Sequence, residues 1–173
     1  MRQPGFYGGG LSLAGAHGQV PASTYAPLHY SGVGALGAIN DCHYLRVTAG
    51  VTPSATGIRV HIGTSSGNIA VAVYADNGAG APGTRLAASG SVASPGTGPR
   101  TIALGSTLDV YPGMWIALAA DNTTVTFGYA GNPGASSSAM GTGFSSIETT
   151  AFPPPASPSG AVSWRSGYIL VAV

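Results

Sequence analysis

Two short runs of alternating residues constrain the fold of this chain more than any other feature. In residues 58–62, isoleucine and valine alternate with arginine and histidine, which is the period of two typical of a half-buried strand. Residues 69–73 repeat the alternation, with alanine between the larger apolar residues. Both runs end in turn-forming residues, at 63–68 and 76–78, where Asn and Gly tolerate the positive φ that tight hairpins need. The pattern predicts antiparallel strands with one buried face.

Similar patterns recur from residue 42 to residue 173. Further strands are predicted at 42–47, 86–92, 100–104, 114–119, 125–129 and 168–173. Residues 51–54 are predicted to form a bend or an edge, because Pro53 cannot donate a hydrogen bond to a neighbouring strand. Short strands at a spacing of about ten residues are typical of β-sandwiches, and no stretch has the periodicity of a capped helix. The predicted fold class is therefore all-β, an antiparallel, jelly-roll-like β-sandwich.

Two regions of the chain differ from this pattern in composition. Residues 1–40 are rich in Gly, Ala, Pro and Tyr without lasting periodicity, and they are predicted to form an extended N-terminal arm. Residues 41–173 form the predicted sandwich, with a Pro/Ser-rich loop at about 131–160. The three prolines at 153–155 favour a stiff polyproline II segment in that loop.

The arm carries large apolar side chains but is too irregular to build a core of its own. Such side chains can fill pockets on another subunit. The alternative is that the arm wraps over its own domain. The predicted residues of the partner interface are Phe6, Tyr7, Leu11, Leu13, Tyr25 and Tyr30.

Charge is scarce in this chain. Only 6% of the residues are charged, against about 25% in a typical soluble domain. Either Ser, Thr, Asn and Gly hydrate the exterior, or partner chains cover much of it. A formal net charge of +1 gives no electrostatic basis for binding nucleic acid, and no segment is apolar for long enough to span a membrane. Residues 1–5 lead into glycine and not into an apolar signal sequence, so synthesis in the cytoplasm is expected.

Three segments carry a resemblance to a known kind of module. Residues 63–74, 83–91 and 114–123 resemble a β-sandwich module of tailed-bacteriophage virion proteins, of the head-decoration, fibre and minor tail type. The resemblance covers roughly residues 42–130. It implies a non-enzymatic structural subunit of the virion, commonly a homotrimer, whose partners are the major capsid protein or other virion subunits. The same sequence pattern also resembles that of extracellular carbohydrate-binding β-sandwiches.

The resemblance leaves the position in the virion open. Because the chain is short and lacks coiled-coil or shaft repeats, a capsid decoration or head-fibre protein is preferred. A minor tail or fibre protein, or a carbohydrate-binding module for host adhesion, is the alternative.

No catalytic set and no cofactor site are predicted. The five carboxylates are spread singly along the chain, whereas glycoside hydrolysis needs two that flank one bond. Asp76 and Asp121 each precede an asparagine in a turn, so hydrogen bonds from the backbone to their side chains are their expected role. The chain is therefore not expected to be an enzyme.

The one cysteine and two of the histidines are metal-ligand candidates by residue type. Cys42 is predicted to be a small buried residue of a strand. His43 and His61 could face each other on adjacent strands. However, Cys42 and His43 point to opposite faces of one strand and cannot both bind one ion without a bulge. Two histidines on a polar face are the preferred interpretation, and no metal site is predicted.

Three aromatic residues are of the type that can stack on a sugar ring. Trp115 lies in an apolar alternating run and is predicted to belong to the core. Trp164 and Tyr168 flank Arg165 and are the candidate glycan contacts.

Overall fold

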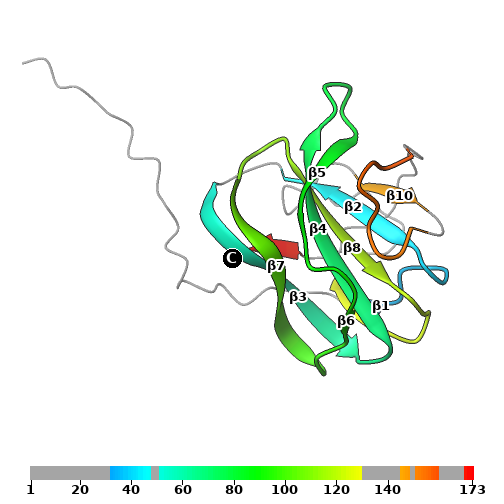
Figure 1. The fold of residues 1–173 in the computed structure, drawn as a ribbon. Coiled ribbons are helices and arrows are strands. Elements are labelled where there is room, and N and C mark those ends of the chain that lie inside the picture. Colours follow the sequence, from blue (N-terminus) through cyan, green and yellow to red (C-terminus); the bar gives the residue numbers. More distant parts are fainter. Residues whose placement is uncertain (1–31, 48–50, 130–144, 149–150, 160–169) are drawn as a thin grey trace, which may run out of the picture.

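The structure of the chain, a computed structural model, describes residues 32–47, 51–129, 145–148, 151–159 and 170–173. All regular secondary structure in these ranges is β-strand, arranged in two antiparallel sheets packed against each other (Figure 1). The predicted β-sandwich is therefore confirmed. Residues 1–31 of the predicted arm lie outside the described residues.

One sheet has five strands and is built around the long strand β3. Its members are β1 (Gly32–Gly34), β3 (Thr52–Thr64), β7 (Gly98–Val110), β9 (Thr126–Tyr129) and β11 (Leu170–Ala172). Val60 of β3 is paired with both Arg100 of β7 and Leu170 of β11, so these strands occupy opposite edges of β3. β9 pairs with the end of β3 on the β11 side, and β1 pairs with β9. β1 and β7 consequently lie at opposite edges of this sheet.

The other sheet has six strands and is centred on β8 and β4. Its members are β2 (Cys42–Arg46), β4 (Asn68–Asp76), β5 (Pro82–Ala88), β6 (Val92–Ala93), β8 (Trp115–Ala120) and β10 (Ser145–Glu148). The order is β10-β2-β8-β4-β5, and β6 pairs with the beginning of β4. β5 and β6 therefore lie on the same side of the sandwich as β7, and β5 contacts β7.

The inner core follows from the alternation in β3 and β4. Ile58, Val60 and Ile62 are fully buried and pack against the buried residues Ile69, Val71 and Val73 of the facing sheet. Phe127 of β9 and Leu118 of β8 belong to the same cluster. The predicted half-buried strand at 58–62 is confirmed, whereas the strand at 69–73 was predicted to have one buried face and is buried on both.

A second apolar layer lies on the outer face of the six-stranded sheet. The residues that alternate with the inner core in β2, β4 and β8 are buried there as well. They are Cys42, Tyr44, Ala72, Tyr74, Trp115, Ala117 and Ala119, and Ala151 joins them from outside the sheet. Trp115 is 2% exposed, which confirms that it is buried, although it lies in this outer layer and not between the sheets. β2, β4 and β8 of the six-stranded sheet are thus buried on both faces.

Several element boundaries differ from the prediction. β1 lies within residues 1–40, so the sandwich already includes residues 32–40, and β10 lies within the predicted loop. Residues 51–54 were predicted as a bend or edge, yet Thr52 already begins β3. Ser54 has a φ of 53°, and the pairing with β7 shifts register on both sides of Ala55, so the strand continues through an irregularity.

Candidate interaction surfaces

A proline-rich segment covers the outer layer of the six-stranded sheet. We term residues 151–159 the strap (orange in Figure 1). Ala151 is buried in the outer layer and Phe152 packs against it. The Ala151 N–H donates to the Asn40 carbonyl at 2.8 Å, which fixes the beginning of the strap beside β2. The strap therefore occupies a face that an adhesion module could otherwise offer to a ligand.

Two side chains of the sheet hold the strap through its carbonyl groups. Tyr74 Oη donates to the Pro155 carbonyl at 2.7 Å. The guanidinium of Arg85 donates to the Pro154 carbonyl, and its backbone N–H donates to the Ala156 carbonyl at 3.1 Å. Proline has no N–H, so carbonyl oxygens are the only backbone groups through which Pro154 and Pro155 can be held.

Glu148 holds the end of the strap to the sheet. Tyr44 Oη donates to Glu148 Oε2 at 2.7 Å, while Ser159 donates to Oε1 from its backbone N–H and its hydroxyl, at 3.0 and 2.6 Å. Tyr44 also meets Tyr74 edge to face, with the ring centroids 5.3 Å apart. Burial raises the pKa of both tyrosines. Burial also acts to raise the pKa of Glu148, but the hydrogen bonds from Ser159 and Tyr44 outweigh it and the pKa is lowered.

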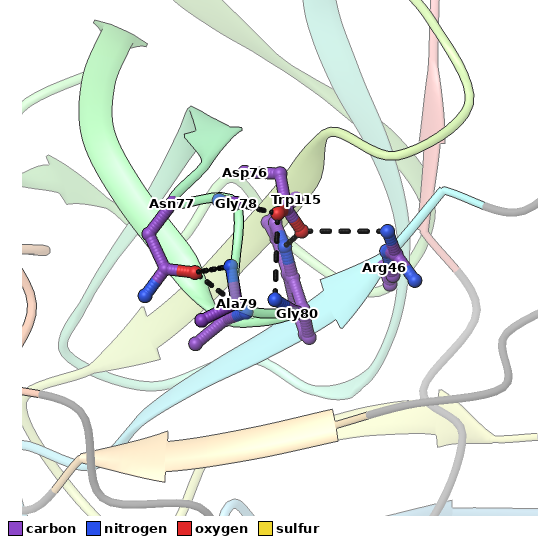
Figure 2. Close-up of polar contacts among 8 residues, drawn as sticks. Arg46, Asp76, Asn77, Gly78, Ala79, Gly80 and Trp115 are labelled. Atoms are coloured by element: carbon purple, nitrogen blue, oxygen red, sulfur yellow. Dashed lines mark hydrogen bonds and ion pairs between the residues drawn. The ribbon is translucent and has the colours of Figure 1, made fainter.

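Asp76 joins the β4–β5 turn to the outer layer (Figure 2). Trp115 Nε1 donates to Asp76 Oδ2 at 3.0 Å, and an Arg46 guanidinium nitrogen lies 3.4 Å from the same oxygen. Oδ1 accepts from the backbone N–H groups of Gly78 and Gly80, at 2.8 and 3.4 Å. The Trp115 indole N–H, followed by these backbone donors, holds the pKa of Asp76 below its ordinary value. The predicted turn role of Asp76 is confirmed.

Asp121 joins two loops at one end of the sandwich. Its carboxylate accepts from the backbone N–H and the side-chain amide of Asn68, at 2.9 and 2.7 Å, and from Asn122 Nδ2 at 2.7 Å. These donors, the Asn122 side chain first, lower the pKa of Asp121. The turn itself is held by Asn122 Oδ1, which accepts from the N–H groups of Thr124 and Val125. Side chain to backbone bonding was predicted correctly, but for Asp121 it links the turn to Asn68 at the beginning of β4.

The two remaining carboxylates also hold backbone groups. Asp109 accepts from the Ser54 N–H at 2.7 Å and from Tyr111 Oη at 2.9 Å, and these bonds lower its pKa. Asp41 is buried and accepts from the Ala38 N–H at 2.8 Å. All five carboxylates of the chain therefore accept hydrogen bonds from its own turns, strands or strap.

The free energy of unfolding is expected to fall as the pH is lowered below the ordinary carboxyl pKa values. The pKa values of Asp76, Asp109, Asp121 and Glu148 lie below their ordinary values of 3.8 and 4.5. A group whose pKa is depressed by folding contributes stability that is fully present above the unfolded pKa and is lost as the pH falls through the folded pKa. Urea unfolding at a series of pH values from about 7 to about 3 measures this loss.

Asp121→Asn provides the comparison for this pH dependence. Asparagine keeps the shape of the side chain but has no charge to titrate, so the variant should lose less stability over the same acidic range. A variant that loses as much stability on acidification as the natural sequence would contradict the role assigned to the Asp121 carboxylate.

The histidines and the cysteine do not come together. His43 lies on β2 of the six-stranded sheet and His61 on β3 of the five-stranded sheet, so the two do not face each other on adjacent strands. His43 is buried, with its Nε2 2.6 Å from the Leu36 carbonyl oxygen, and its assignment to a polar face was wrong. Cys42 is fully buried, as predicted, and burial raises the pKa of its thiol from 9.0 to about 12. The described ranges contain no group of three or more His, Cys, Asp or Glu residues that could hold a metal ion.

Large apolar side chains that reach solvent are scattered over the described surface. They are Val33, Ile39, Val51, Leu86, Tyr111 and Val171, which belong to different strands and loops. Tyr111 is the aromatic member of this set, and its hydroxyl is bound to Asp109.

An open apolar groove of about 400 Å³ runs between the two sheets on the side of β7. β7 forms one wall, and the β5–β6 turn with β6 forms the other. Ile102 and Leu104 of β7 and Val92 of β6 line the groove and also pack against the inner core. The groove therefore opens toward the flank of the core.

The predicted site residues all lie outside the described residues: Phe6, Tyr7, Leu11, Leu13, Tyr25, Tyr30, Trp164 and Tyr168.

In the part of the chain that the structure describes, no helix has the length and apolar character needed to cross a membrane. Comparison of the chain with protein-family models, with curated proteins and with solved structures gives no match.

Proposed function

We propose that this chain is a non-enzymatic structural protein of a bacteriophage virion, a capsid decoration or head-fibre protein that docks on capsid neighbours through its N-terminal arm. The observation that carries the proposal is the use of the carboxylates. All five side-chain carboxylates accept hydrogen bonds from the protein's own turns, strands or strap, which supports a structural role for them.

The low charge of the chain supports an assembled state. With 6% charged residues, the exterior has little electrostatic repulsion to keep copies apart, which suits a surface that is fitted against neighbours. The segments that carry the resemblance to virion modules fall on the β3–β4 hairpin, on β5 and on β8, which form the body of the sandwich. The arm enters this body at β1, an edge strand, from which it can extend toward a neighbour.

Deletion of residues 1–30 is expected to leave a folded sandwich that no longer joins virus particles. Residues 32–129 contain most of the strands of both sheets and of the inner core, so the circular dichroism spectrum should keep its β character. Binding should be lost because the apolar arm residues provide the docking surface, at about 25 cal/mol per Å² buried. Co-sedimentation with capsids that lack this protein measures the binding.

The full-length chain is the positive control in that experiment. Unchanged co-sedimentation after the deletion would place the anchor on the sandwich and not on the arm. A glycan array with cell-wall sugars should show no binding by the full-length chain. Micromolar glycan binding without capsid binding would instead favour a host-adhesion module.

A further inference from the structure

The outer edge of β7 has the character of a strand-docking site. β7 pairs with β3 along one edge, and no described strand pairs with its other edge. Between Arg100 and Asp109 the strand contains no charged residue and no proline, and its pairing with β3 is regular from Gly98 to Ala103. Proteins usually protect an exposed edge with charges, proline or a covering segment, because its free N–H and C=O groups are a template for another strand.

The groove beside this edge could receive the side chains of an added strand. A strand paired with β7 would point alternate side chains inward and outward. The inward side chains would enter the groove and meet Ile102, Leu104 and Val92 at the flank of the core. The groove therefore selects a short extended segment with apolar residues two positions apart and small or polar residues between them.

The N-terminal arm contains such a segment. Leu11 and Leu13 are separated by Ser12, and glycine precedes and alanine follows them. In an extended strand the two leucines would lie on one face and Ser12 on the other. The small neighbours would allow a close approach to the β7 backbone.

We propose that the Leu11–Ser12–Leu13 segment of one copy of this chain adds as a strand to the β7 edge of a second copy, with both leucines in the groove. The arm leaves the sandwich from β1, at the edge of the five-stranded sheet opposite to β7. Each copy therefore extends its own arm from one edge and binds a neighbour's arm at the other edge. This is a head-to-tail contact that can close into a ring. The stretch between Leu13 and Gly32, at about 3.3 Å per extended residue, is long enough to reach a neighbour. The proposal rests on the proposed function, because it takes Leu11 and Leu13 of the arm as the residues that join copies of this chain to one another.

The arm side of this contact is tested by the mass of the purified full-length chain, measured by light scattering and native mass spectrometry. The natural sequence should form oligomers. The double substitution Leu11→Asp and Leu13→Asp should weaken self-association at least tenfold, because it would place two charges in the apolar groove. Ser12→Asp, on the outward face, should assemble like the natural sequence. A natural sequence that stays monomeric, or a Ser12→Asp variant that dissociates as fully as the double variant, would overturn the proposal.

The groove side is tested by filling it. Ala93 lines the groove and is exposed, so Ala93→Trp should fill the groove and weaken self-association without disturbing the core. Leu86→Trp adds the same ring on the neighbouring strand β5 at an exposed position outside the groove, and it should leave assembly unchanged. Both variants should keep the circular dichroism spectrum of the natural sequence. Equal assembly of the Ala93→Trp and Leu86→Trp variants would contradict the groove as the receiving site.

Disulfide cross-linking distinguishes a neighbouring arm from the chain's own arm. A Leu13→Cys chain mixed with an Ala93→Cys chain and oxidised glutathione should give a disulfide-linked pair on a non-reducing gel. A chain that carries both substitutions and forms only an internal disulfide would overturn the exchange between copies. None of these measurements uses virus particles. Self-assembly without particle binding would therefore count against the proposed function alone, and particle binding by a monomer would count against this inference alone.

Discussion

Replacement of Trp115 with alanine is expected to lower the free energy of unfolding by about 3–5 kcal/mol, the usual effect of deleting a large buried aromatic side chain. Trp115 is 2% exposed in the outer layer of the six-stranded sheet, and the indole N–H of Trp115 is bound to Asp76. The substitution would leave a cavity in the outer layer and would free the β4–β5 turn from the sheet. Because domains of this size are stable by about 5–15 kcal/mol, urea unfolding should detect a large shift of the midpoint.

Two further variants separate packing from hydrogen bonding at this position. Trp115→Phe keeps an aromatic ring but removes the N–H donor, so a smaller loss of about 1–2 kcal/mol is expected. Leu86→Ala, at a position 44% exposed on β5, should cost less than about 1 kcal/mol. If Trp115→Ala cost no more than Leu86→Ala, the outer layer would not be a second core.

The inner core could be predicted because alternation reports directly on one buried face. Residues 58–62 and 69–73 place isoleucine and valine at every second position, and all of these residues are fully buried between the sheets. The long irregular start of β3 could not be predicted in the same way. Pro53 signals a break in pairing, yet the register shifts around Ala55 let the strand pass it.

The outer layer left a sequence signal that alternation does not capture. Residues 69–74 and 115–120 are apolar without interruption, and a strand that is buried on both faces reads as a continuous apolar run. Alanine at 70, 72, 117 and 119 indicates that the covering segment approaches closely. What covers the face could not be predicted, because the strap follows far along the chain and its Pro and Ser residues are typical of an exposed loop.

The short edge strands β1 and β10 also could not be predicted from the sequence. β1 spans three residues, two of them glycine, and β10 contains two serines, so neither has strand periodicity of its own. They are strands because β1 pairs with β9 and β10 pairs with β2. His43 was misjudged for a related reason: a histidine in an alternating strand reads as polar surface, whereas the Leu36 carbonyl accommodates it in the interior.

Cys42 is expected to react with iodoacetamide at about pH 8 at least a thousandfold more slowly in the native protein than in the unfolded chain. The thiolate is the reactive form, and burial raises the thiol pKa from 9.0 to about 12, which alone reduces the thiolate about a thousandfold. The outer layer and the strap also exclude the reagent from a side chain with 0% exposure. The modified fraction is measured by mass spectrometry of the intact chain over time, with and without urea.

Variants that weaken the hydrogen bonds to the strap test whether the strap must open before Cys42 can be modified. Tyr74→Phe combined with Arg85→Ala removes two side-chain hydrogen bonds to the strap, at about 1 kcal/mol each, and should speed modification about thirtyfold. Asp121→Asn disturbs loops at one end of the sandwich and does not touch the strap, so it reports how much modification proceeds through general unfolding. If Asp121→Asn speeds modification as much as the strap variants do, Cys42 is reached through general unfolding of the domain. If the native protein reacts as fast as the unfolded chain, Cys42 is not covered at all, and the closed outer face assigned to the six-stranded sheet would have to be given up.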